Sequence, residues 1–92
     1  MNLEETIKAG IGTIVDVRTY EEFLGGHVVG SINIPLNEVP ERLEELKQLD
    51  LPLLLCCAAG MRSGQAQQFL SQQGIECHNA GSWLDVNYYK SL

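Results

Sequence analysis

Basic residues are scarce in this chain of 92 residues: six Lys and Arg stand against twelve Asp and Glu, which gives a net charge of -6. Nucleic acids and anionic membrane surfaces attract positive patches, so this balance argues against both as partners. No apolar run approaches the roughly 20 residues that a membrane span needs. Residues 1–5 also lack the positive charge and apolar run of a signal peptide. We therefore expect a cytoplasmic protein with reduced thiols.

Cysteine is also rare, with three residues of which two are adjacent: Cys56, Cys57 and Cys77. An odd number with an adjacent pair does not predict a disulfide framework. The sequence has no Cys-x-x-Cys spacing, and neighbours on a strand point to opposite faces, so Cys77 and His78 do not predict a metal site. Repeats, low-complexity tracts and linkers are missing too. Residues 1–92 are therefore predicted to form a single domain around one core.

Short apolar runs alternate with helical patterns along the chain. Two of the runs, 13–17 and 53–57, are typical of buried strands, 27–34 is strand-like but interrupted by Gly30, and 75–79 alternates as a last strand would. Residues 80–82 are predicted to turn and 83–89 to form a short closing helix. A helix is predicted over 63–73, and three earlier helices have candidate N-caps in Asn2, Thr19 (with Glu22 as a capping box) and Asn37. This alternation predicts an α/β fold with a mostly parallel sheet of four to five strands and helices on both faces.

Polar and reactive side chains follow two of the predicted strands. In open α/β sheets, ligands bind beyond the carboxyl ends of the strands, and Asp16, Arg18 and Cys57 fall at such ends. Asp16 and Arg18 are best explained as a buried ion pair or cap that supports the site. The alternative is a direct role, in which Asp16 binds loop amides or orients Arg62 and Arg18 faces the mouth of the pocket.

Cys57 is the candidate nucleophile. The small residues that follow let successive amides converge on one point, Arg62 adds a positive charge, and a helix N-terminus follows at Ser63. Such surroundings lower the pKa of a thiol from about 8.5 by one or more units. Cys56 also precedes Arg62, at the spacing of cysteine-dependent phosphatases. Gly60 stands three residues after Cys57, however, and strand alternation keeps the two thiols out of one pocket, so Cys56 is predicted to belong to the core.

Four segments together resemble the single-domain rhodaneses, which are sulfurtransferases. They span most of the chain, and in order they are Asp16-Val17-Arg18, Gly26 to Pro35 (Gly-His-Val-Val-Gly-Ser-Ile-Asn-Ile-Pro), Cys57 to Ala66 (Cys-Ala-Ala-Gly-Met-Arg-Ser-Gly-Gln-Ala) and Asn79-Ala80-Gly81. In that family the histidine of the second segment, here His27, is generally structural.

This resemblance implies that sulfur is transferred through a persulfide on Cys57, without a cofactor. The donor would be thiosulfate or a persulfide and the acceptor cyanide or a thiol, as small molecules or on a protein. The charge would be held by an anion loop of Ala58, Ala59, Gly60, Met61 and Arg62, which together with Cys57 has the six-residue length suited to sulfur. Asp16, Arg18 and Ser63 would support it.

Two departures from the family pattern bear on the substrate. Rhodaneses known for thiosulfate turnover often carry a basic residue inside the loop, whereas here the only one is Arg62, at its end. Ser82 stands where a second glycine is common. Weak thiosulfate activity with a persulfide as the true donor is therefore expected. The alternatives are a phosphatase or arsenate reductase on the same loop, and a non-catalytic rhodanese-like binding module.

Overall fold

Strands and short helices alternate along the chain in the computed structural model, which describes residues 2–92. Met1 lies outside the described residues. It belongs to the predicted domain and to residues 1–5, which were not expected to form a signal peptide. The elements are α1 (Leu3–Lys8), β1 (Thr13–Asp16), α2 (Tyr20–Leu24), β2 (Ile32–Asn33), the 3-10 helix η1 (Leu36–Glu38), α3 (Leu43–Lys47), β3 (Leu53–Cys57), α4 (Met61–Gln72), β4 (Cys77–Ser82) and α5 (Trp83–Ser91).

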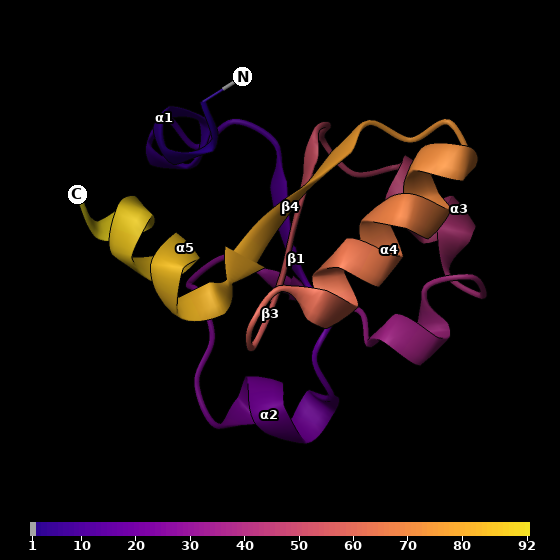
Figure 1. The fold of residues 1–92 in the computed structure, drawn as a ribbon, viewed down its shortest axis with the longest axis horizontal. Coiled ribbons are helices and arrows are strands. Elements are labelled where there is room, and N and C mark those ends of the chain that lie inside the picture. Colours follow the sequence, from indigo (N-terminus) through magenta and orange to yellow (C-terminus); the bar gives the residue numbers. More distant parts are fainter. Residues whose placement is uncertain (1) are drawn as a thin grey trace.

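The four strands form one sheet in the order β2-β1-β3-β4, and every pair is parallel (Figure 1). All five residues of β3 are buried, as expected for a central strand with both faces covered. The predicted α/β fold with a parallel sheet and helices on both faces is confirmed, and residues 2–92 contain four strands. Parallel pairing brings the carboxyl ends of β1, β3 and β4 to the same edge of the sheet.

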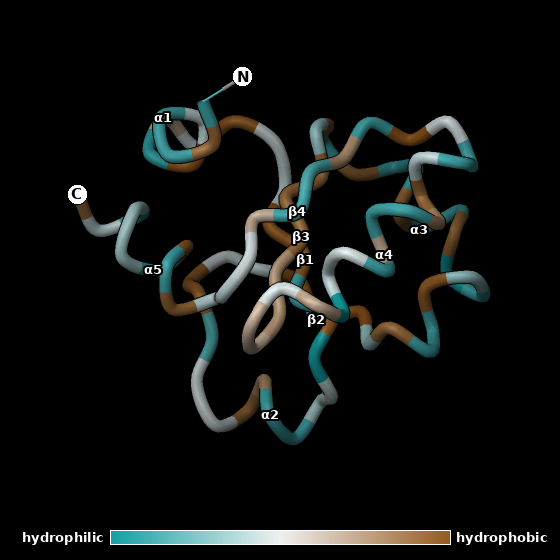
Figure 2. Tube along the Cα trace, viewed as in Figure 1, coloured by the Kyte–Doolittle hydropathy of each residue, from teal (hydrophilic) through white to brown (hydrophobic). Residues whose placement is uncertain are grey.

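Alternate side chains of β3 enter two separate cores. Leu53, Leu55 and Cys57 pack in the core that includes residues of α3 and α4, whereas Leu54 and Cys56 pack in the core that includes residues of α1 and α5. Figure 1 shows these helix pairs on opposite sides of the sheet, and Figure 2 shows hydrophobic residues gathered along the central strands. The two adjacent cysteines therefore face opposite sides, as strand alternation predicts.

Two of the predicted helix starts are confirmed in atomic detail. The Asn2 side chain accepts a hydrogen bond from the Glu5 amide at 3.1 Å. Thr19 and Glu22 form a complete capping box at the start of α2, with each side chain bound to the other residue's backbone amide. Within residues 2–92, no helix is long and apolar enough to cross a membrane.

The predicted strand over 27–34 is much shorter in the structure, and the predicted cap at Asn37 is wrong. Gly30 adopts a φ of 85° and the Ser31 amide bonds to the Val28 carbonyl, so a turn interrupts the segment and only Ile32–Asn33 form a strand, β2. Asn37 lies inside η1 and caps nothing. Val39, the residue before Pro40, keeps helical dihedral angles (φ -54°, ψ -48°), but the helix expected there is divided into η1 and α3.

The predicted closing helix over 83–89 is confirmed as α5, but the predicted helix over 63–73 and the last predicted strand are displaced along the sequence. α4 begins at Met61, two residues before the predicted start, because Gly60 takes the N-cap position with a φ of 94°. β4 runs to Ser82 through the residues expected to turn, since pairing with β3 resumes beyond a bulge opposite Leu55 and Cys56. This bulge brings Gly81 beside the end of β3.

Candidate active site

Cys57 ends the central strand, and its side chain is 1% exposed. The chain then passes through a loop of small residues and enters α4. Three hydrogen-bonding groups from the loop and α4 surround the sulfur: the Gly60 amide at 3.1 Å, the Ser63 amide at 3.5 Å and the Ser63 hydroxyl at 3.4 Å. They converge on one atom because α4 begins at the left-handed turn of Gly60.

These contacts change the ionisation of Cys57. Burial raises the pKa of its thiol, but the three hydrogen-bonding groups, together with the nearby amide of Ala59, more than offset burial and lower the pKa to about 7. A thiol with such a pKa is substantially ionised at neutral pH, and the thiolate is the form that attacks electrophiles. No general base is needed to prepare it.

Cys56 has the opposite character, although it is the adjacent residue. Burial and the nearby charge of Asp16 raise the pKa of its thiol to about 12. Its side chain is 0% exposed and belongs to the core on the α1 and α5 side. Cys77 lies in the core on the α3 and α4 side, with its sulfur 3.5 Å from the Ser71 hydroxyl. Of the two adjacent cysteines, Cys57 is therefore the one with an environment that stabilises a thiolate.

Asn79 joins the loop to the edge strand β4, and the sequence did not single it out. Its Nδ2 donates to the Gly60 carbonyl at 3.0 Å, while its Oδ1 accepts from the Gly81 amide at 3.0 Å and the Ser63 hydroxyl at 2.7 Å. The amide orientation is therefore set by a donor and an acceptor on the backbone. The sequence signal was its place in the Asn79-Ala80-Gly81 segment, which the resemblance identified only as a turn.

The Ser63 hydroxyl has a single proton and two acceptors within reach. Asn79 Oδ1 is closer than the Cys57 sulfur, at 2.7 Å against 3.4 Å. When Cys57 is a neutral thiol, the hydroxyl donates to Asn79 and the thiol can donate to the hydroxyl oxygen. When Cys57 ionises, rotation of the hydroxyl gives the thiolate a further donor, and Asn79 retains its bond from Gly81.

Arg62 does not point at the sulfur. Its guanidinium makes two hydrogen bonds to the Glu22 carboxylate, Nη1 to Oε1 at 2.7 Å and Nη2 to Oε2 at 3.0 Å. These bonds and those from Thr19 lower the pKa of Glu22 to about 2. The pair joins α2 to the start of α4. Glu22 was expected only as a capping-box residue, and no local signal connects it with a residue 40 positions away.

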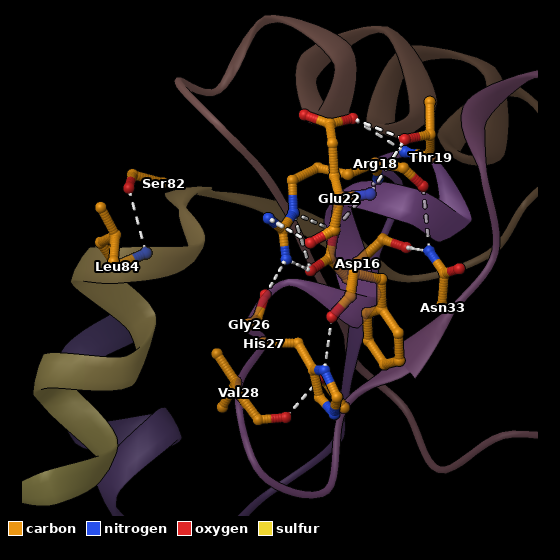
Figure 3. A network of polar contacts seen from close by, with 12 residues as sticks. Asp16, Arg18, Thr19, Glu22, Gly26, His27, Val28, Asn33, Ser82 and Leu84 are labelled. Carbon is orange, nitrogen blue, oxygen red and sulfur yellow. Dashed lines mark hydrogen bonds and ion pairs between the residues drawn. The ribbon is translucent and has the colours of Figure 1, made fainter.

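Asp16 and Arg18 form a buried ion pair beneath this edge of the sheet (Figure 3). Arg18 Nη2 lies 2.7 Å from Asp16 Oδ2 and also donates to the Gly26 carbonyl at 2.8 Å. The guanidinium covers the Trp83 ring, 4.6 Å from its centroid. Among residues 2–92, the Asp16 carboxylate accepts hydrogen bonds from Arg18 alone. It therefore neither binds the loop amides nor orients Arg62.

The rest of the loop forms the rim of the site. Ala58 and Ala59 are exposed, and the Met61 side chain is 77% exposed. His27 lies after α2, where its ring stacks on Phe23 with centroids 3.7 Å apart and its Nδ1 is 2.7 Å from the Phe23 carbonyl. In the part of the chain that the structure describes, no group of three His, Cys, Asp or Glu side chains is placed to hold a metal ion.

Cys57 thus stands at the end of a central parallel strand, and the loop and the start of α4 present backbone amides to its sulfur. A model of the rhodanese-like domain family matches residues 2–87, so the chain belongs to that family. It is 40% identical over 74 residues to thiosulfate sulfurtransferase PspE of Escherichia coli, a match that covers 78% of this chain and 71% of PspE. It is 41% identical over 73 residues to the uncharacterized protein YqhL of Bacillus subtilis, covering 77% of this chain but only 57% of YqhL.

Solved structures agree with this assignment. A rhodanese from Escherichia coli, solved with anions, matches 79% of this chain and 88% of its own, with a TM-score of 0.71 and 40% identity. A rhodanese-related protein of Thermoplasma volcanium matches 94% of this chain and 83% of its own, with a TM-score of 0.77 and 36% identity. The fold and the family are therefore those of the rhodanese-like domain.

Proposed function

We propose that this chain is a sulfurtransferase that carries sulfane sulfur as a persulfide on Cys57. The observation that carries the proposal is the convergence of the Gly60 and Ser63 amides and the Ser63 hydroxyl on one buried sulfur with a pKa of about 7. Relatives named as sulfurtransferases, PspE among them, support the reaction class.

In the first step the Cys57 thiolate attacks the outer sulfur of the donor. A new sulfur–sulfur bond forms on Cys57, the donor's own sulfur–sulfur bond breaks, and its electron pair leaves with sulfite from thiosulfate or with a thiolate from an alkyl persulfide. The loop amides, fixed before the reaction, stabilise the negative charge on the nucleophile and on the persulfide.

In the second step an acceptor removes the outer sulfur. Cyanide or a thiolate attacks it, forms a bond to it and returns the bonding electron pair to Cys57, which gives thiocyanate or a new persulfide and regenerates the thiolate. The rim of Ala58, Ala59 and the exposed Met61 leaves the outer sulfur open to an acceptor, either a small molecule or a cysteine on another protein.

The proposal is tested by intact mass spectrometry after incubation with thiosulfate or with hydroxyethyl persulfide. We expect a gain of about 32 Da, one sulfur atom, that cyanide removes. Cys57→Ser should show no gain, while Cys77→Ser, which changes a cysteine buried away from the loop, should behave as wild type. If no donor produces the gain, the sulfurtransferase proposal fails. Hydrolysis of p-nitrophenyl phosphate that Cys57→Ser abolishes would instead favour the phosphatase alternative.

A further inference from the structure

The charge of Arg62 is neutralised by a carboxylate that is itself held in place. Glu22 Oε1 accepts hydrogen bonds from the Thr19 amide at 3.0 Å and the Thr19 hydroxyl at 3.1 Å, as well as from Arg62 at 2.7 Å. The carboxylate is thus fixed by the capping box before the arginine binds it. A two-bond arginine–carboxylate contact of this kind is among the stronger hydrogen-bonded pairs.

Basic side chains elsewhere do not replace Arg62 at the site. Arg18 is paired with Asp16, Arg42 with Glu38 and Glu45, and Lys47 with Glu44. Among residues 2–92, Lys8 and Lys90 make no ion pair. Lys8 lies on α1 and Lys90 on α5, and Lys90 lines a cavity with residues of α1 and β1 that does not include the loop. A doubly charged donor therefore approaches a chain with a net charge of -6 and meets a thiolate with no unpaired cation beside it.

We propose, on the basis of the sulfurtransferase function above, that Glu22 is a specificity-determining residue that selects against sulfur donors with an anionic sulfonate group, such as thiosulfate. By holding Arg62, Glu22 keeps the guanidinium from binding a sulfonate group. The donor class that fits the remaining site carries its sulfane sulfur on an uncharged alkyl group, as in an alkyl persulfide.

The two donor classes differ in what the site must hold. Thiosulfate and the Cys57 thiolate give a persulfide and sulfite, so three negative charges are brought together and need a cation nearby. An ionised alkyl persulfide and the Cys57 thiolate give an ionised Cys57 persulfide and an alkyl thiolate, so two negative charges are present throughout, one fewer than with thiosulfate. The loop amides are sufficient for the reaction with an alkyl persulfide, but they are insufficient for efficient capture of thiosulfate.

Glu22→Gln separates these reactions, because glutamine also serves as the last residue of a capping box while removing the charge. We expect the second-order rate constant for persulfide formation on Cys57 to rise about tenfold with thiosulfate and to change less than about twofold with hydroxyethyl persulfide. Glu21→Gln is the matched control, since it removes the same charge from an exposed position on the same helix and should leave both rates unchanged. Adding Arg62→Gln to Glu22→Gln should abolish the gain.

The outcomes distinguish the inference from the function on which it rests. A larger thiosulfate rate with a nearly constant alkyl persulfide rate supports a role of Glu22 in donor selection. Equal changes with both donors, or no change with thiosulfate in a variant that keeps the wild-type melting temperature, overturn it. If wild type forms no persulfide with either donor, the sulfurtransferase proposal itself fails.

Discussion

Cys56 and Cys57 are joined by one peptide bond, yet the sheet gives them opposite chemistry. The side chain of Cys56 enters a core where burial raises the pKa of its thiol, whereas Cys57 meets the amides of the loop. The sequence suggested that Arg62 would supply the positive charge near Cys57, but this charge is paired with Glu22. Hydrogen-bond donors at the sulfur, rather than a free cation, therefore lower the pKa of Cys57.

The contribution of the Ser63 hydroxyl can be isolated, because Ser63→Ala keeps the backbone amide that bonds the sulfur. We expect the pKa of Cys57 to rise by up to about one unit, since the thiolate loses one of its donors. Alkylation rates measured against pH report this shift. Ser71→Ala is the matched control, because it removes a hydroxyl from the same helix near Cys77. An unchanged pKa in Ser63→Ala would show that the hydroxyl stays on Asn79 in both ionisation states.

At the junction of the loop and α4, the N-terminus of the helix is itself part of the site. Gly60 occupies the N-cap position and has no side chain to cap the helix. The Cys57 sulfur accepts from the Ser63 amide instead, which is the third amide of α4 and the usual partner of a capping side chain. A negative charge on the sulfur also interacts favourably with the helix N-terminus. The nucleophile and the helix thus stabilise each other.

Gly60→Ala tests this junction. Its new Cβ would lie no closer than 3.5 Å to a neighbouring atom, so the expected cost comes from the positive φ and is about 1–2 kcal/mol in the free energy of unfolding. The strain should also move the Gly60 amide and raise the pKa of Cys57. Gly74→Ala, at a φ of 79° beyond the other end of α4, should cost a similar amount in urea unfolding and leave that pKa unchanged. If the pKa of Cys57 were the same in Gly60→Ala and Gly74→Ala, the role of the Gly60 turn would be contradicted.

The elements differ in how well the sequence predicts them, and the reasons are physical. β3 is predictable because a continuous apolar run between turn signals suits a strand buried on both faces. The start of α4 was placed too late because the group that caps it, the Cys57 sulfur, comes from the preceding strand rather than from a local Ser, Thr or Asp. The Glu22–Arg62 pair and the bonds of Asn79 depend on tertiary packing, so no local pattern indicates them.

At the scale of the whole molecule, the parallel sheet assembles the site from distant segments. The ends of β1, β3 and β4 supply Asp16, Cys57 and Gly81, while α2 and α4 supply Glu22 and Arg62. The site therefore exists only in the folded chain, and its local donors act against a net charge of -6. The assignment of residues 1–92 as one domain and the cytoplasmic location stay predictions.

The central claim, that the folded loop holds Cys57 as a reactive thiolate, is tested most directly by the rate of its alkylation with iodoacetamide as a function of pH. Peptide mass spectrometry assigns the label to Cys57, and the urea-unfolded chain is the control. We expect a midpoint near pH 7 in the folded protein, with a rate that falls about tenfold per pH unit below it because the thiolate fraction falls. In the unfolded chain the Cys57 thiol should titrate with a pKa of about 8.5. A midpoint of about 8.5 or above in the folded protein would contradict the claim and favour a non-catalytic binding module.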